Sequence, residues 1–199
     1  MIKKGIYPKT QRVSCSEQNL CQITEKIDGS NLCIFKLNGT IYFAQRNNIF
    51  SEEELEEISY RGLGIWAKEH LEYFKQNIYE GACICGEWLG MGKIKYDFKN
   101  RFFMFAKANI NEKMELYNVK YYHEFFKYSF VEQALPDFIS EVPIVKECRN
   151  PLSKEELDEL YTEYCLRENR VIEGFVCNFM NSVTKYVRYK DGKLQDHRE

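Results

Sequence analysis

The stretch Thr24-Glu25-Lys26-Ile27-Asp28-Gly29-Ser30-Asn31 stands directly before two apolar-rich runs, Leu32 to Leu37 and Thr40 to Gln45. Asn38-Gly39 joins these runs, and an Asn-Gly pair in this setting is a strong hairpin signal because both turn positions need a positive φ. The sequence therefore predicts an antiparallel hairpin with Lys26 at its mouth. A lysine on a rigid element can act as a nucleophile when burial, a nearby cation or an aligned phosphate activates its amine.

Composition limits the class of protein. The chain has 199 residues, 44% hydrophobic and 15% aromatic, enough for a sizeable core. Its formal charge of -2 argues against a strongly basic nucleic-acid binder, so any nucleic-acid contact must come from a local patch. The eight Cys form no C-x-x-C pair and there are three His, so a zinc site is not expected. No stretch is typical of a signal peptide or a membrane span, and we expect a reducing cytoplasmic compartment without membrane contact.

Helices are expected in the middle and late parts of the chain. Ser51 and Glu54 form a capping-box pattern that predicts a helix over about 52–60. Apolar residues at helical spacing predict helices over 65–77 and within 112–130. Ser153 and Glu156 form a second capping-box pattern, at the start of a helix that runs to about Glu168.

Two expected strands each lead to a carboxylate beside a glycine. The buried run 82–85 precedes Glu87, which stands between Gly86 and a second glycine three residues further on. The apolar run 171–176 is interrupted by Glu173. A buried unpaired charge is costly, and a divalent cation that prefers oxygen ligands is the natural partner for such a carboxylate.

The short motifs resemble those of the covalent nucleotidyltransferases, which include ATP-dependent DNA ligases, RNA ligases and capping guanylyltransferases. Lys26-Ile27-Asp28-Gly29 resembles their K-x-D-G nucleophile motif, and Gly86-Glu87 resembles the third motif. Residues 173–176 resemble the fourth motif, E-G-x-V. The expected strand over 183–190 carries cations at alternating and near-alternating positions, which would line one face, and this basic strand resembles the fifth motif. Glu25 before the lysine and Ser30-Asn31 after the glycine are similar to nick-sealing RNA ligases, whereas DNA ligases usually have Arg where Asn31 stands.

The resemblance implies roles for particular residues. Lys26 is the expected catalytic nucleophile, and Glu173 and Glu87 are the expected metal ligands. Arg46 would clamp a phosphate or a polynucleotide end, and Phe105 would stack on the base, with Phe103 as the alternative. Many relatives have Asp where this chain has Ala106. The residues expected to bind nucleotide are Glu25, Asp28, Asn31, Arg46, Glu87, Phe105, Lys185, Arg188 and Lys190.

The resemblance also implies a fold and an activity. The fold would be α+β, with two antiparallel β-sheets flanking a nucleotide cleft and helices outside, as in the ligase nucleotidyltransferase or ATP-grasp-like fold. A single nucleotidyltransferase domain would span residues 1–199 without a C-terminal OB-fold.

The activity implied is that of an ATP-dependent RNA ligase in RNA repair. It would join 5′-phosphate and 3′-hydroxyl ends through a lysyl-AMP intermediate, with ATP and Mg²⁺ or Mn²⁺ as cofactors. Its partner would be nucleic acid, either RNA ends or a nicked duplex, with a further protein or domain supplying end binding. The alternatives are a minimal DNA ligase, a GTP-dependent capping enzyme, and a catalytically inactive module that binds nucleotide or nucleic acid.

Overall fold

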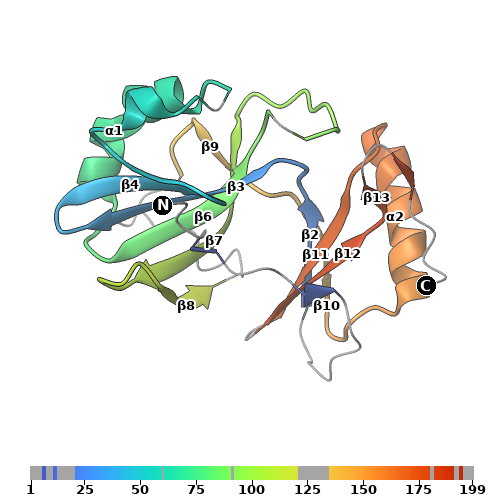
Figure 1. The fold of residues 1–199 in the computed structure, drawn as a ribbon. Coiled ribbons are helices and arrows are strands. Elements are labelled where there is room, and N and C mark those ends of the chain that lie inside the picture. The colour runs from blue at the N-terminus through green and yellow to red at the C-terminus, as the bar shows by residue number, and fades with distance from the viewer. Residues whose placement is uncertain are drawn as a thin grey trace. The chain divides into compact units, whose positions relative to one another are not determined.

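The computed structural model describes residues 6–7, 11–12, 21–59, 61–90, 92–120, 135–179, 182–190 and 193–194. Over these residues the fold is α+β, with mainly antiparallel sheets and two α-helices (Figure 1). The chain divides into two compact units. The first comprises Met1–Pro8, Gly29–Met91 and Phe98–Glu141, and the second comprises Lys9–Asp28, Gly92–Asp97 and Val142–Glu199.

The first unit is built on a seven-stranded sheet with the order β5-β4-β3-β6-β7-β8, in which β9 pairs in parallel with β7. Its strands are β3 (Ser30–Leu37), β4 (Thr40–Gln45), β5 (Ile49–Ser51), β6 (Ala82–Trp88), β7 (Phe102–Ile110), β8 (Leu116–Lys120) and β9 (Ile139–Glu141). The predicted hairpin is confirmed: β3 and β4 pair directly, and the turn residues Asn38 and Gly39 have φ of 53° and 77°.

Helix α1 (Leu63–Asn77) covers one face of this sheet, and its buried Ala67 and Phe74 share a core with alternate residues of β3 and β6 (Figure 1). The expected helix over 52–60 is wrong in extent, because only the 3-10 turn η1 (Leu55–Glu57) forms there. Ser51 ends β5 instead, and its N–H and hydroxyl both donate to the Glu54 carboxylate.

The expected helix within 112–130 is also wrong where it can be compared. Residues 116–120 form β8, which pairs with β7 across an irregularity in register. Leu116 and Val119 pack against the core cluster on the second face of the sheet. Apolar residues three apart suit a helix, but pairing with a long neighbouring strand prevails here. The remaining residues of that predicted helix, 121–130, lie outside the described residues.

The second unit has a five-stranded sheet with the order β1-β12-β11-β2-β10. Its strands are β1 (Gln11–Arg12), β2 (Cys21–Lys26), β10 (Ile144–Cys148), β11 (Gly174–Asn178) and β12 (Val183–Val187). All pairings are antiparallel except that of β1 with β12. The strands β13 (Tyr189–Lys190) and β14 (Lys193–Leu194) form a separate ribbon.

Helix α2 (Lys154–Glu168) packs on one face of the five-stranded sheet. The predicted capping box at its start is confirmed: the Ser153 hydroxyl accepts the Glu156 N–H, and the Glu156 carboxylate accepts the Ser153 N–H. Cys21 and Ile23 of β2 enter the core beneath α2, and strand alternation places Glu25 on that same face. Lys26 therefore lies on the opposite face.

The position of Lys26 corrects one expectation. Lys26 is the last residue of β2 and belongs to the five-stranded sheet, whereas the 38–39 hairpin belongs to the seven-stranded sheet. The reason is that the chain leaves the strand conformation at Ile27 and Asp28 before β3 begins at Ser30. Lys26 thus lies at the end of a strand, as expected, but this strand belongs to a different sheet from the hairpin.

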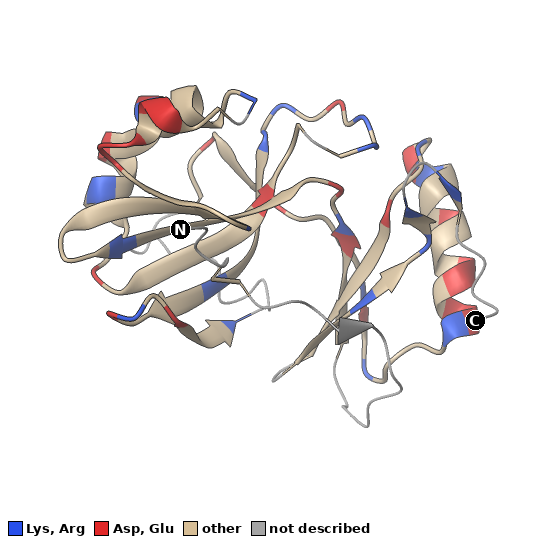
Figure 2. Cartoon of the chain, in the orientation of Figure 1, with Lys and Arg blue, Asp and Glu red and all other residues tan. Residues whose placement is uncertain are grey.

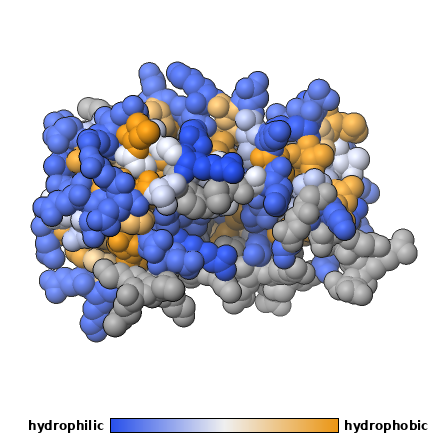
Figure 3. Space-filling view, turned by 45° about the horizontal axis from the view of Figure 1, so that its top comes forward, coloured by the Kyte–Doolittle hydropathy of each residue, from blue (hydrophilic) through white to orange (hydrophobic). Residues whose placement is uncertain are grey.

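The visible face in Figure 3 is mainly hydrophilic among the described residues. Exposed large apolar side chains are spread along the chain, at Ile65, Tyr79, Tyr117, Ile144, Leu166, Val171 and Leu194. In the described part of the chain, neither helix combines the length and the apolar character that a membrane span requires.

Candidate active site

The centre of the candidate site is an ion pair between Lys26 and Glu173. Lys26 pairs with Gly174 at the ends of β2 and β11, which brings the preceding Glu173 beside it. The Lys26 Nζ lies 2.5 Å from the Glu173 Oε2, and the two side chains are 22% and 16% exposed. The pair is thus sheltered but still open to a ligand from solvent.

Gly174 explains why a glycine must follow this glutamate. Its φ is +153°, and a Cβ added there would overlap the carbonyl of Tyr186 on β12. The Glu173 carbonyl accepts the N–H groups of Arg188 and Tyr189, at 2.9 and 3.0 Å. The glutamate backbone is therefore held by strand pairing on one side and by the 188–189 segment on the other.

The electrostatics of Glu173 involve two further predicted residues. Burial raises the pKa of its carboxyl above the usual value of 4.5, and the Lys26 ammonium opposes this rise. Asp28 adds to the rise in pKa and Lys185 opposes it, so both lie close enough to influence the carboxylate. The structure brings Lys26, Asp28, Glu173 and Lys185 into one electrostatic environment.

Asp28 is held by a segment that the sequence analysis did not single out, Gly92–Asp97. The Asp28 Oδ2 accepts the N–H groups of Lys93 and Ile94, at 2.5 and 2.9 Å. The Asp28 N–H donates to the Tyr96 hydroxyl at 2.8 Å. A Cβ on Gly92 would overlap the Asp28 backbone. The signal was a Gly-x-Gly-Lys pattern at 90–93, which permits close backbone approach.

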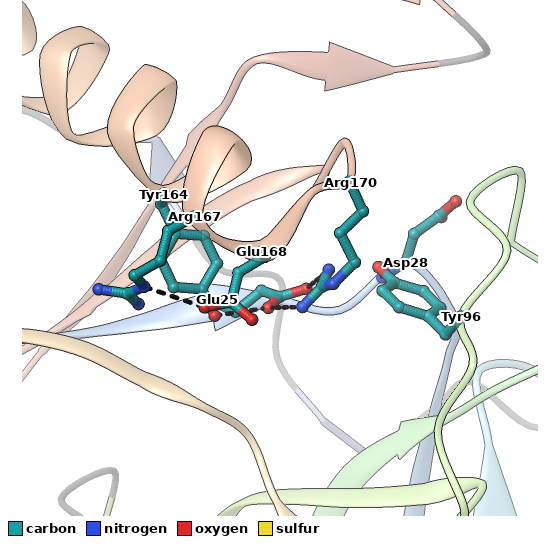
Figure 4. Close-up of polar contacts among 7 residues, drawn as sticks. All are labelled: Glu25, Asp28, Tyr96, Tyr164, Arg167, Glu168 and Arg170. Carbon is teal, nitrogen blue, oxygen red and sulfur yellow. Dashed lines mark hydrogen bonds and ion pairs between the residues drawn. The ribbon is translucent and has the colours of Figure 1, made fainter.

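Glu25 lies on the other face of β2 in a buried network (Figure 4). Its carboxylate, fully buried, accepts two hydrogen bonds from Arg170, at 2.6 and 2.5 Å, and one from the Tyr164 hydroxyl at 2.9 Å. The Arg170 guanidinium carbon also lies 5.4 Å from the centroid of the Tyr96 ring. These contacts give Glu25 an anchoring position, facing α2 and away from Lys26.

The three predicted cations near the C-terminal end do not share one face, which corrects that expectation. Lys185 lies in register with Val176 and Thr24, on the same face as Lys26. Arg188 instead pairs with Asp158 of α2, with 3.3 Å between Nε and Oδ1. Lys190 lies in the separate ribbon and is exposed. The strand breaks because Arg188 and Tyr189 both donate to the Glu173 carbonyl.

The first unit holds the remaining predicted residues. Asn31 of β3 and Glu87 of β6 lie directly opposite each other and so project from the same face of the sheet. Together with Arg46, which follows β4, they line a cavity of about 460 Å³. Its other described lining residues are Gly29, Ser30, Gln45, Asn47, Asn48, Phe50 and Ser59. The structure thus gathers Asn31, Arg46 and Glu87 in one polar cavity of this unit.

The two candidate base-stacking rings differ in position. Phe103 is in register with Glu87, is 4% exposed, and its ring centroid lies 4.8 Å from that of Phe98. Phe105 lies at the register shift of β7 and packs edge-on against Tyr7, with 5.2 Å between ring centroids. Neither ring is among the described residues that line the 460 Å³ cavity. The stacking role stays a prediction.

The model of the RNA ligase family matches residues 19–190 of this chain. The chain belongs to the RNA ligase family. A search of the curated proteins gives no significant match.

Solved RNA ligase structures share the fold. An archaeal ATP-dependent RNA ligase aligns with a TM-score of 0.59 at 18% identity, covering 91% of this chain and 48% of that chain. A Naegleria gruberi RNA ligase mutant with ATP and Mn aligns with a TM-score of 0.57 at 17% identity, covering 94% and 59%. An apo mutant of a Naegleria gruberi RNA ligase gives 0.56 at 16% identity, covering 92% and 57%. This chain thus spans about half to three-fifths of the length of these structures.

In this member of the family, the position of Glu173 suits a hard divalent cation. Its carboxylate oxygen already faces a cation, the Lys26 ammonium, and burial raises the pKa of the carboxyl, so added positive charge would favour its ionised form. A second cluster of possible metal ligands consists of three cysteines. The sulfurs of Cys33, Cys83 and Cys85 lie within 4.8 Å of one another. Burial raises the pKa of all three thiols well above the usual range, and such soft ligands do not suit Mg²⁺.

Proposed function

We propose that this protein is an ATP-dependent RNA ligase that forms a covalent lysyl-AMP at Lys26 and joins 5′-phosphate to 3′-hydroxyl ends. The observation that carries the proposal is the pairing of the Lys26 amine with Glu173 at the end of β2. The family match over residues 19–190 supports it. The solved structures with this fold include a Naegleria gruberi RNA ligase mutant with ATP and Mn and an archaeal ATP-dependent RNA ligase, which supports the choice of nucleotide and metal.

In the first step the Lys26 nitrogen attacks the α-phosphorus of ATP. A nitrogen–phosphorus bond forms, the bond to the bridging oxygen breaks, pyrophosphate leaves, and the amine gives up its proton. Lys185 lies on the same face of the sheet as Lys26 and can neutralise negative charge on the α-phosphate during the transfer. Strand pairing fixes the Lys26 backbone at the end of β2, and the contact with Glu173 positions its amine, which supplies part of the orientation that such a displacement needs.

Within the second unit, Glu173 would hold a divalent metal ion, and Glu87 stays the metal ligand predicted in the first unit. When bound, Mg²⁺ or Mn²⁺ supplies charge neutralisation to the triphosphate. A cation bound at Glu173 would replace the Lys26 ammonium there, and the ammonium would then lose a proton to solvent, which makes the amine lone pair available. Asp28 stands in the same electrostatic environment, and its oxygen stays fixed by two backbone N–H groups.

In the second and third steps the AMP passes to a 5′-phosphate, and a 3′-hydroxyl then displaces it. We assign end and sugar recognition to the polar cavity of the first unit, where Arg46 can pair with a phosphate and Asn31 and Glu87 can bond hydroxyl groups. We propose RNA ends or a nicked duplex as the substrates. A partner protein or domain would help to bind the ends. We also propose a role in RNA repair in the cytoplasm, which the seven free cysteines of the described residues support.

The test is the intact mass of the protein after incubation with ATP or GTP and Mg²⁺. We expect the mass to rise by one AMP with ATP only, and the gain to vanish in Lys26→Ala while the Lys68→Ala control, at an exposed surface ion pair, keeps it. A gain with GTP alone would indicate a capping-type enzyme, and no gain with either nucleotide would indicate an inactive module. Sealing assays on nicked RNA and nicked DNA duplexes then separate an RNA ligase from a minimal DNA ligase.

A further inference from the structure

The segment Gly92–Asp97 presents lysines beside the nucleophile motif. Exposure alternates along it: Ile94 and Tyr96 are partly buried, whereas Lys93, Lys95 and Asp97 are exposed. We propose that Lys93 and Lys95 bind backbone phosphates of the polynucleotide substrate next to Lys26. The proposal rests on the proposed function, because it assigns substrate contacts to that site.

The segment is fixed to the K-x-D-G motif through its backbone. The Lys93 and Ile94 N–H groups donate to the Asp28 carboxylate, and the Tyr96 hydroxyl accepts the Asp28 N–H. The tight approach of Gly92 to Asp28 leaves no room for a side chain there. Since Asp28 is two residues from Lys26, both lysines start from backbone that is anchored next to the nucleophile.

A second anchor lies at Tyr96. The Arg170 guanidinium, already bound to Glu25, lies over the Tyr96 ring at 5.4 Å (Figure 4). The inward side of the segment is therefore held by hydrogen bonds and a cation–π contact. This leaves the alternate residues, Lys93 and Lys95, directed to solvent and available to a ligand.

Charge supports a polyanion as that ligand. Within the described part of the chain, no carboxylate forms an ion pair with Lys93 or Lys95. The whole chain has a formal charge of -2, so its overall field does not attract nucleic acid and a local basic segment must do so. Figure 2 shows Lys and Arg positions recurring along the connection between β6 and β7, which contains this segment.

The exposure of the two lysines favours a polynucleotide over the ATP triphosphate. A long backbone can lie along two outward-facing cations that are two residues apart. Each phosphate contact releases counterions when the complex forms. The logarithm of the association constant therefore falls as the logarithm of the salt concentration rises, with a slope of about −0.9 per phosphate contact on a duplex. The slope of RNA affinity against salt concentration is therefore a measure of the number of phosphate contacts.

The experiment compares wild type with Lys93→Ala/Lys95→Ala in binding a fluorescein-labelled, 5′-phosphorylated nicked RNA duplex by anisotropy, across a salt series. We expect weaker binding and a slope smaller by about 2. The matched control is Lys146→Ala/Lys154→Ala, which removes two exposed lysines of the same unit and should keep the wild-type slope. Lys93→Glu/Lys95→Glu should weaken binding further, and thermal unfolding checks that each variant is folded.

A second arm measures ATP-dependent mass gain at Lys26 in the same variants, and we expect a rate within about twofold of wild type. An unchanged affinity and slope for RNA would overturn the proposal. So would a slowed mass gain with unchanged RNA binding, which would assign the lysines to the ATP phosphates. If wild type binds the duplex but never gains AMP, the proposed ligase function fails while the salt slopes still decide the role of the two lysines.

Discussion

The Lys26 Nζ lies 2.5 Å from the Glu173 Oε2, although 147 positions separate the two residues in the chain. The pairing of β2 with β11 alone produces this contact, because it sets Lys26 opposite Gly174. The structure thus brings together the lysine and the glutamate that the sequence predicted for one site, and their roles stay a prediction. Glu87 belongs to the other unit, and its place beside them stays a prediction.

Glu173→Gln should abolish most of the AMP transfer to Lys26. The amide keeps the shape and an acceptor but removes the negative charge that faces the lysine and would hold a metal ion. Loss of one preorganised electrostatic contact of this kind costs about 10²–10³ in rate. Single-turnover mass gain with ATP measures it. Glu163→Gln, at an exposed position of α2, is the control and should react at the wild-type rate; equal rates for both variants would refute the role of Glu173.

The same carboxyl predicts a pH dependence of stability. Burial raises the pKa of Glu173 in the folded state above 4.5, so the folded protein holds its proton more tightly than the unfolded chain. The free energy of unfolding of wild type should therefore fall, relative to Glu173→Gln, as pH rises from 4.5 through the raised pKa. Urea titrations of both proteins between about pH 4 and 7 measure the difference. A difference that is constant with pH, or that grows in favour of wild type, contradicts the shift.

Local signals in the sequence predicted local structure well. Asn38-Gly39 marks its turn because both residues adopt positive φ, and Ser153 marks the start of α2 because its hydroxyl replaces a missing backbone partner. The Glu173-Gly174 pair was predicted to be functional because its carboxylate interrupts an apolar run. The structure adds a backbone reason for the glycine, namely its positive φ beside Tyr186.

Non-local contacts were not predictable from one sequence. The partner of Glu25 is Arg170, 145 positions away, and nothing in the local pattern of either residue indicates the other. The placement of Lys26 in the five-stranded sheet likewise depends on which strands pair. Arg188 was expected to share a face with Lys185, but its backbone bond to Glu173 shifts the alternation and directs it to Asp158.

Arg170→Met should destabilise the protein strongly. Among the described residues, it leaves the fully buried Glu25 carboxylate with the Tyr164 hydroxyl as its partner, and breaking a buried pair in this way costs about 3–5 kcal/mol. Urea unfolding measures the loss. The double variant Glu25→Gln/Arg170→Met removes both charges and should recover most of it. If the double variant is as unstable as the single one, the cost comes from packing and the pair is not the cause.

Gly174→Ala should damage stability and activity together. A side chain at a φ of +153° is strained by about 1–3 kcal/mol, and its Cβ would also overlap the Tyr186 carbonyl. Relief requires β11 to move away from β12, which would displace Glu173 from Lys26. The measurements are urea unfolding and single-turnover mass gain with ATP.

Gly39→Ala is the control, because Gly39 also has a positive φ, +77°, but its added Cβ would meet no described atom within 4 Å apart from its chain neighbours. That variant should show the backbone strain alone and keep the wild-type rate of AMP transfer. The excess destabilisation of Gly174→Ala then reports the overlap with β12 together with the greater strain of a side chain at a φ of +153°. If both variants lose equal stability and both keep full activity, the close approach at Gly174 does not position Glu173.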